Sequence, residues 1–303
     1  MNCIEDRNVV ETNGEASVSK ASCVIAGYYD DKYIRCFVAV TGKRNPIINL
    51  GYAIRVAVFR NLVASFVRNY PEGQIVSIGA GFDTLGFWAL EHAPDITVFE
   101  IDYPSVVAAK STVIDRNPAI FTPILGTNGG SRYRIHACDL RHTPHELVRV
   151  LMTAGFSTSR PSLFLAECTL IYLDPDVNDA ITRSVFENGS DPNIPVFFAS
   201  YDQVNPLDSF GRVMMSNLNA RGCPLRSIQP NTGSQISRLR EMGFSNVRVE
   251  LMNHFTTRCK PKRPEIIDEV EELNLLQTHY IFSLASCRSS YDSKFFSEVF
   301  FET

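Results

Sequence analysis

The chain has 303 residues, 45% of them hydrophobic, and a formal net charge of −4 at pH 7. This length supports one substantial core with additions, so we expect a single domain. No extended block of Lys and Arg occurs, which argues against nucleic acid as a partner, because phosphate neutralisation supplies most of the affinity of such proteins. No run of about 18 consecutive apolar residues occurs either, so no membrane span is expected.

The cysteines and the N-terminal residues bear on the cellular compartment. Eight cysteines are scattered along the chain without a CxxC pair, so zinc-binding spacing is absent and no metal site is expected. The mostly polar residues 1–19 do not resemble a signal peptide. Free thiols without a secretion signal are typical of a reducing compartment. We therefore expect a soluble, cytoplasmic protein.

In chain order, we expect a flexible tail over residues 1–19, a helical cap over residues 20–72 and a sheet core over residues 73–303. Apolar runs rich in strand-forming residues predict seven strands. These runs are Gln74–Ile78, Thr97–Ile101, Tyr133–Cys138, Ser162–Ala166, Pro195–Ser200, Val247–Leu251 and Tyr280–Ser286. Several of them are continuously apolar, which is typical of strands covered on both faces, as in parallel sheets.

Helix signals alternate with the earlier strands. Pro104 opens a segment of helical pattern that ends before Pro118. Asp174 and Pro175 predict the N-cap and first turn of another helix. Strands that alternate with helices predict βαβ units, and therefore a doubly wound α/β fold with a mostly parallel sheet.

The first predicted strand runs directly into the sequence Gly79-Ala80-Gly81. Glycines at the end of a strand let the backbone turn tightly and approach a nucleotide closely. An ordinary tight turn between a strand and a helix is the alternative for so short a motif. The next strand ends in Asp102, 23 residues after Gly79, where a carboxylate can accept both hydroxyls of a ribose.

Two features favour S-adenosylmethionine over a dinucleotide as the ligand of this turn. The full dinucleotide fingerprint has a third glycine where this chain has Thr84. A dinucleotide also places its pyrophosphate at the helix N-terminus, where Asp83 would repel it. S-adenosylmethionine carries no phosphate, so these residues favour it as the cofactor.

Acidic residues follow two further strands. The third strand leads into Asp139 and Leu140, which could bond the adenine amino group and cover the ring. A helix N-cap is the alternative role for Asp139. The fourth strand leads into Glu167, and Tyr172 follows just after. Ligands of open α/β sheets bind at the carboxyl ends of the strands, so Asp102, Asp139 and Glu167 together indicate a ligand site.

Arg55 is a charge at the centre of an apolar helix face. With residues 51–69 taken as a helix, the apolar arc around it consists of Val58, Phe59, Leu62, Val63 and Phe66. A buried charge is costly unless it is paired. Arg55 therefore either pairs with an internal carboxylate or meets an anionic ligand, such as the carboxylate of the cofactor. Lys20 is a weaker candidate, because a lysine in such a segment is usually a solvated charge.

Taken together, these motifs resemble the leucine carboxyl methyltransferase family. The matching segments are AGYYDDKYI at 26–34, NPIINLGYAIRV at 45–56, SIGAGFDT at 77–84, FEIDYP at 99–104, CDLR at 138–141, LAECTLIYLDPD at 165–176 and YDQVNPLDSFGRVM at 201–214. The resemblance implies a Rossmann-like, class I S-adenosylmethionine-dependent methyltransferase with a seven-stranded, mostly parallel sheet, added N-terminal helices and a helical insertion near 202–243. It also implies methylation of the C-terminal leucine carboxylate of the protein phosphatase 2A catalytic subunit. We expect a monomer.

Carried over by motif, the resemblance assigns residues around the methionine part of S-adenosylmethionine. It implies that Lys20 and Arg55 bind the carboxylate of the cofactor. It further implies that Gly79 forms the turn beneath the methionine part and that Glu167 lies near the amino group.

The same resemblance assigns the adenosine contacts and the acceptor site. It implies that Asp102 accepts the ribose hydroxyls, and that Asp139 and Leu140 contact the adenine. The candidate catalytic residues are Arg55 and Tyr172, with Tyr172 positioning the acceptor carboxylate. A terminal carboxyl titrates near 3.5, so the acceptor is already ionised at neutral pH and needs no general base.

The chain departs from the family pattern at two places. The segment between Asp102 and Asp139 is shorter than expected for the family. Leu50 stands where a basic residue is expected, which would alter docking if that position contacts a partner.

Three further functions are compatible with the sequence. A sister branch acts on a carboxylate of a hypermodified tRNA base in the wybutosine pathway, but its larger members carry a β-propeller, whose repeats this chain lacks. A methyltransferase that acts on a small molecule would need the same cofactor site. A protein that binds the cofactor and only masks the phosphatase tail, without methyl transfer, would need it as well.

Overall fold

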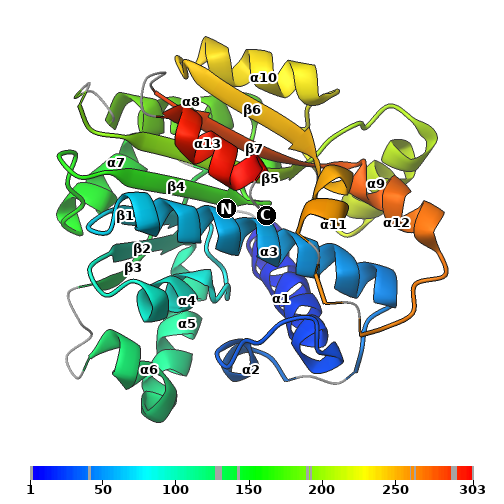
Figure 1. Ribbon diagram of the computed structural model, residues 1–303, viewed down its shortest axis with the longest axis horizontal. Coiled ribbons are helices and arrows are strands. Elements are labelled where there is room, and N and C mark those ends of the chain that lie inside the picture. The colour runs from blue at the N-terminus through cyan, green and yellow to red at the C-terminus, as the bar shows by residue number, and fades with distance from the viewer. Residues whose placement is uncertain are drawn as a thin grey trace.

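A seven-stranded sheet organises the fold (Figure 1). The computed structural model describes residues 3–39, 42–126, 132–141, 144–188, 191, 193–259, 261–262, 264–287 and 292–301. Within these residues the strands are β1 (Gln74–Ile78), β2 (Thr97–Asp102), β3 (Tyr133–Ala137), β4 (Ser162–Glu167), β5 (Val196–Gln203), β6 (Asn246–Leu251) and β7 (Tyr280–Ser286). Their order across the sheet is β3-β2-β1-β4-β5-β7-β6, and β7 runs antiparallel to β5 and β6. The predicted α/β class and mostly parallel sheet are therefore confirmed.

Helices precede the sheet and connect its strands (Figure 1). They are α1 (Cys3–Ala26), α2 (Ile34–Phe37), α3 (Pro46–Asn69), α4 (Leu85–His92), α5 (Pro104–Arg116), α6 (Pro118–Leu125), α7 (Pro144–Thr153), α8 (Pro175–Asn188), α9 (Ser209–Ala220), α10 (Thr232–Glu241), α11 (Phe255–Arg258), α12 (Val270–Gln277) and α13 (Asp292–Phe301). Two single 3₁₀ turns are η1 (Leu170–Tyr172) and η2 (Met252–His254). Helices α9 and α10 lie between β5 and β6, in the region expected as a helical insertion.

The N-terminal region differs from the sequence-based expectation. Residues 1–19 were expected to form a flexible tail, but α1 begins at Cys3 and continues to Ala26, with residues 1–2 outside the described chain. Ser17 and Ser19 are buried. The polar composition is misleading here because small polar side chains fit where α1 packs closely on α3. The boundary at residue 20 therefore falls inside a helix.

The sheet is covered on both faces, as its continuously apolar strands predict. One apolar cluster includes Phe59 and Phe66 of α3 together with Phe87 of α4. The opposite cluster includes Leu147 of α7 and Ile181 of α8. Each cluster also takes alternate side chains from the central strands, so every helix layer buries one face of the same sheet.

Helix α3 is the long apolar helix of the cap. By length and composition alone it could cross a membrane, since its most apolar window has a mean hydropathy of 1.4, but 61% of that window is buried inside the fold. It packs against α1 and α13. The apolar composition of α3 is therefore that of a core helix covered on most sides. Leu50, the position noted for a missing basic residue, lies in this helix with 1% of its surface exposed, so it belongs to the core.

The order of the strands places a topological switch point between β1 and β4, which are neighbours in the sheet. From this pair the chain winds toward β3 on one side and toward β6 on the other. Ligands of doubly wound proteins bind in the crevice outside the carboxyl ends of the strands at such a point. Gly79 follows β1 and Glu167 ends β4, so both flank this crevice.

Candidate active site

The chain turns sharply after β1 because Gly79 and Gly81 adopt φ angles of +68° and +51°. Glycine reaches such angles without a steric penalty. The N–H groups of Gly79 and Ala80 donate to Ile101 O at 2.8 and 3.2 Å, so β2 supports the turn. A Cβ atom at Gly79 would lie only 2.1 Å from Thr169 Cγ2. The turn therefore requires glycine both for its conformation and for the close approach of the loop after β4.

Asp102 lies beside this turn, as predicted. Its Oδ2 accepts a hydrogen bond from Gly81 N at 2.6 Å, and its Oδ1 accepts one from Tyr103 N at 2.6 Å. Burial raises the pKa of the carboxyl group. A carboxylate offers about four lone-pair positions, so each oxygen retains one for a further donor such as a ribose hydroxyl.

Asp139 and Leu140 follow β3, which pairs with β2 so that Asp102 lies opposite Ala137. Asp139 Oδ1 accepts hydrogen bonds from Arg141 N at 3.0 Å and Arg141 Nε at 2.9 Å, and its Oδ2 pairs with Arg141 Nη2 at 2.7 Å. Leu140 is buried. The structure thus brings Asp102, Asp139 and Leu140 to the same edge of the sheet, with Asp139 oriented by its neighbour Arg141.

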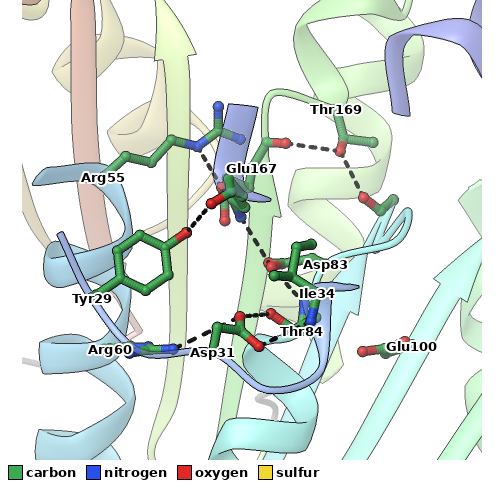
Figure 2. Close-up of polar contacts among 12 residues, drawn as sticks. Tyr29, Asp31, Ile34, Arg55, Arg60, Asp83, Thr84, Glu100, Glu167 and Thr169 are labelled. Carbon is green, nitrogen blue, oxygen red and sulfur yellow. Dashed lines mark hydrogen bonds and ion pairs between the residues drawn. The ribbon is translucent and has the colours of Figure 1, made fainter. Parts of the chain in front are cut away.

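Glu167 at the end of β4 is the centre of a buried ion-pair network (Figure 2). Its Oε1 accepts hydrogen bonds from Lys20 Nζ at 2.9 Å and from Arg55 Nε. Lys20 Nζ also donates to Asp83 Oδ1 at 3.0 Å. Burial alone would raise the pKa of Asp83, but the Lys20 ammonium group lowers it to about 2. Two cations and two carboxylates from four separate segments therefore meet at the switch point.

The sequence left open whether Arg55 pairs with an internal carboxylate or meets an anionic ligand. The structure shows the internal pair, with Glu167. The residue is 7% exposed, and its guanidinium carbon lies 4.5 Å from the ring centroid of Tyr201 and 5.3 Å from that of Tyr52. The pair with Glu167 uses Nε. Among the described residues the two Nη groups have no hydrogen-bond partner, so the end of the fork is available to an anion.

The cap is tied to the turn after β1 by further polar contacts (Figure 2). Thr84 Oγ1 donates to Asp31 Oδ2 at 2.5 Å, and Asp31 Oδ1 accepts from the backbone of Tyr33 and Ile34. Tyr29 OH donates to Lys20 O at 3.1 Å. Thr84, which replaces the third glycine of a dinucleotide fingerprint, thus anchors the loop between α1 and α2.

Tyr172 lies in η1, close to the end of β4. Burial raises its pKa, and the nearby Cys168, Tyr280 and Tyr52 raise it further. Cys168 and Tyr52 also raise the pKa of Arg55. Tyr172 and Arg55 therefore share the neighbours Cys168 and Tyr52. Cys168, just after Glu167, has a φ of +52°, an uncommon conformation for a residue other than glycine that is found at functional sites.

Sequence reasoning missed one group of this site, Tyr201, and one buried group beside it, Lys110. Tyr201, whose ring lies against the Arg55 guanidinium group, stands one residue beyond the strand predicted over Pro195–Ser200, so the apolar run gave no signal for it. Lys110 of α5 is fully buried, and its Nζ donates to Asp83 O at 2.7 Å. Lys110 stands four residues from both Val106 and Ile114, so the argument applied to Arg55, a charge on an apolar helix face, would have found it.

The donors and acceptors at this edge fit S-adenosylmethionine better than a phosphate-bearing nucleotide. A ribose has an acceptor in Asp102, and an amino-acid moiety has the cations Lys20 and Arg55 together with the carboxylate of Glu167. A pyrophosphate at the turn after β1 would instead approach the carboxylates of Asp83 and Asp102. The fold and this set of donors and acceptors define the class: the protein is an S-adenosylmethionine-dependent methyltransferase.

Comparison with known proteins refines the class. The family described as leucine carboxyl methyltransferase matches residues 14–186. The Leucine carboxyl methyltransferase 1 homolog of Arabidopsis thaliana is 35% identical over 91% of this chain and 88% of its own length, and Leucine carboxyl methyltransferase 1 of Bos taurus is 30% identical over 93% and 90%. A duf574 family protein from Streptomyces avermitilis has the same fold, with a TM-score of 0.56 and 16% identity over 89% of this chain and 96% of that one.

The chain belongs to the leucine carboxyl methyltransferase family. It is a carboxyl methyltransferase that uses S-adenosylmethionine. A further relative, tRNA wybutosine-synthesizing protein 4 of Rattus norvegicus, is 30% identical over 92% of this chain but is matched over only 44% of its own length.

Proposed function

We propose that the protein transfers the methyl group of S-adenosylmethionine to the α-carboxylate of the C-terminal leucine of the protein phosphatase 2A catalytic subunit, and so regulates phosphatase assembly. The observation that carries this proposal is the buried Arg55 fork, whose Nη groups are free among the described residues and lie beside Glu167. A planar guanidinium matches the two oxygens of a carboxylate. The relatives named for leucine carboxyl methylation support the same acceptor.

The residues proposed to hold the cofactor follow the geometry of the strand ends. Asp102 accepts the ribose hydroxyls, and Asp139 with Leu140 contacts the adenine. Gly79 leaves room beneath the methionine part. Lys20 and Arg55 bind the carboxylate of the cofactor, and Glu167, which already joins both cations, faces its amino group. When bound, S-adenosylmethionine supplies a methyl group on a positively charged sulfur.

The acceptor carboxylate needs orientation and a dry environment rather than a base. A C-terminal carboxyl titrates near 3.5 and is ionised at neutral pH. Its oxygen forms the new C–O bond as the methyl–sulfur bond breaks, so an anion and a cation become a neutral ester and a neutral thioether. Removing water from such a pair favours this loss of charge, and in-line alignment by bound groups can contribute roughly 7–11 kcal/mol at best.

Arg55 and Tyr172 are proposed to position the acceptor. The guanidinium group has five N–H donors, so Arg55 can serve the cofactor and the acceptor with different nitrogens. The rings of Tyr52 and Tyr201 pack against it and limit its movement. Tyr172 is protonated at neutral pH, as tyrosine ordinarily is, and burial raises its pKa further, so its hydroxyl can donate to a carboxylate.

The test is methyl transfer from radiolabelled S-adenosylmethionine to the purified phosphatase catalytic subunit. We expect a base-labile methyl ester on the intact subunit and none on a subunit that lacks its terminal leucine. Equal labelling of both proteins would contradict the proposed acceptor. Binding of the cofactor and the phosphatase without ester formation would instead support a protein that only masks the tail.

The second candidate acceptor is the carboxylate of the wybutosine precursor in tRNA, favoured by the similarity to the rat wybutosine-synthesizing protein. The same assay with unfractionated tRNA as the acceptor separates the two. Labelling of tRNA without labelling of the phosphatase would replace the proposed function with this one.

A further inference from the structure

Lys110 is a fully buried cation that the proposed chemistry does not use. It lies on the inner face of α5, with none of its surface exposed. Its Nζ pairs with Glu100 Oε2 at 2.5 Å and donates to Asp83 O at 2.7 Å. The rings of Phe37 and Phe87 lie 5.8 and 5.3 Å from the same nitrogen. The ammonium group is thus enclosed by apolar walls and held by one carboxylate and one backbone carbonyl.

The surroundings of Glu100 are built around this pair. Glu100 stands in the middle of β2, is 1% exposed, and accepts a further hydrogen bond from Tyr133 OH at 2.7 Å. A Cβ atom at Gly86 would lie 2.7 Å from Glu100 Oε1, so the first turn of α4 approaches the carboxylate closely. Burial raises the pKa of Glu100, and Lys110 opposes that effect.

Such a pair contributes little to stability compared with well-packed apolar residues, because both charges lose their hydration. An apolar pair at these two positions would not provide the hydrogen bond from Lys110 Nζ to Asp83 O. That carbonyl belongs to the loop between the glycine turn and α4. The side chain of the same residue, Asp83, holds Lys20 at 3.0 Å, and Lys20 in turn holds Glu167 at 2.9 Å.

We infer that Lys110 is a positioning residue for cofactor binding, which fixes the loop at Asp83 so that Asp83 orients Lys20 toward the methionine end of the site. In Figure 2, Glu100 lies below the loop, and Asp83 lies between Glu100 and Glu167. The Lys110–Glu100 pair thus contacts the backbone carbonyl of Asp83, and the Asp83 side chain contacts Lys20. This inference rests on the proposed placement of S-adenosylmethionine at the strand ends.

The test compares variants that separate the pair from the loop contact. Lys110→Met combined with Glu100→Gln removes both buried charges together, so neither is left unpaired. Lys110→Leu with Glu100→Gln provides a second packing solution should the first yield insoluble protein. Tyr133→Phe is the matched control, because it removes a buried hydrogen bond of the same cluster and leaves the contact with Asp83 O in place.

Calorimetric titration with S-adenosylmethionine and thermal unfolding are the readouts. We expect the double variant to stay folded and its cofactor Kd to rise about tenfold, the scale of one lost hydrogen bond from a charged donor, with kcat at saturating cofactor little changed. Tyr133→Phe should lower the unfolding temperature and leave the Kd within about twofold. An unchanged Kd in the double variant, or an equal rise in Tyr133→Phe, overturns the inference.

A thermodynamic cycle with Asp83→Asn tests the route. If Lys110 acts through Asp83, the double variant should weaken binding less in the Asp83→Asn background than in the parent. Purely additive effects would show that Lys110 acts by another route and so overturn the inference. Asp102→Ala in the same titration separates failure of this inference from failure of the proposed function. Normal binding by that variant would contradict the proposed cofactor site itself.

Discussion

Lys20 Nζ lies 2.9 Å from Glu167 Oε1, although 147 positions separate the two residues in the sequence. The contact joins the N-terminal helix α1 to the end of β4. Both side chains are largely buried, with 8% and 13% of their surface exposed. Because Arg55 also binds Glu167, removal of either cation leaves the carboxylate with one partner. This shared pairing makes the network testable by single substitutions.

Arg55→Ala should leave the fold intact and lower kcat/KM for methyl transfer by about 100-fold or more, because it removes the Nη donors proposed to bind carboxylates, and hydrogen bonds to charged groups contribute roughly 1.5–3 kcal/mol each. Arg55→Lys should recover little, since lysine lacks the planar fork. Steady-state kinetics and thermal unfolding measure the two effects. Arg68→Ala is the control on the same helix, because the Arg68 side chain is 61% exposed. Unfolding of Arg55→Ala without cofactor would instead assign Arg55 a purely structural role.

Asp102→Asn should raise the Kd for S-adenosylmethionine by about tenfold or more, because an amide offers only one oxygen to the two backbone donors and the ribose. Gly81 N and Tyr103 N already bond the two carboxylate oxygens, so the variant also disturbs the turn. Isothermal titration with S-adenosylmethionine measures the change. Glu146→Gln, at an exposed ion pair on α7, should bind normally. An Asp102→Asn protein that matches it would refute the ribose assignment.

Gly79→Ala should destabilise the protein by about 1–3 kcal/mol, because a positive φ is strained for alanine and Thr169 blocks the new methyl group. Chemical denaturation monitored by fluorescence measures the loss. Gly42→Ala is the control, since a Cβ there meets nothing within 4 Å. Shortening the neighbour by Thr169→Gly in the Gly79→Ala background should recover part of the stability. No recovery would mean that strain in the turn, rather than the clash, dominates.

Asp202→Asn should flatten the pH dependence of stability in mildly acidic solution. Burial raises the pKa of Asp202 from its ordinary value of 3.8 to about 6. The folded chain therefore binds this proton more tightly than the unfolded chain, so the stability present below the unfolded pKa is lost as the pH rises through about 6.

The expected loss for the parent protein is about 2 kcal/mol between about pH 4.5 and about pH 7.5, since one pKa unit corresponds to about 1.36 kcal/mol. Urea unfolding at a series of pH values measures it. Asp202→Asn should lack this component, because an amide does not titrate in the range. Identical pH profiles for the two proteins would show that Asp202 is not the group responsible.

The strands and the charged position in α3 could be predicted because they depend on local pattern. Each of the seven predicted strands was found, with ends within a few residues, because runs rich in strand-forming residues mark both the buried central strands and the partly exposed edge strands β3 and β6. Arg55 was predicted to be buried because helical periodicity alone puts it on the apolar arc. Asp102 and Asp139 lie at one edge of the sheet, as their positions at strand ends predicted, because the carboxyl ends of parallel strands share that edge.

Lys20 shows the limit of such reasoning. From its local segment it was expected to be an ordinary solvated lysine, yet it is 7% exposed and pairs with both Asp83 and Glu167. The tail expected before it is helical, because packing of α1 on α3 compensates for a polar sequence. Neither fact has a local signal, since both depend on partners far away in the chain.

The amino-acid sequence alone therefore determined the sheet, the glycine turn and the acidic strand ends, because these follow from hydrophobic period and backbone conformation. The tertiary structure alone decided which charges meet. Whether Arg55 pairs internally, whether Lys20 is buried and which loop Lys110 holds are set by distances between segments that local periodicity does not contain. A buried charge must find a partner, but only the folded chain determines which partner lies within reach.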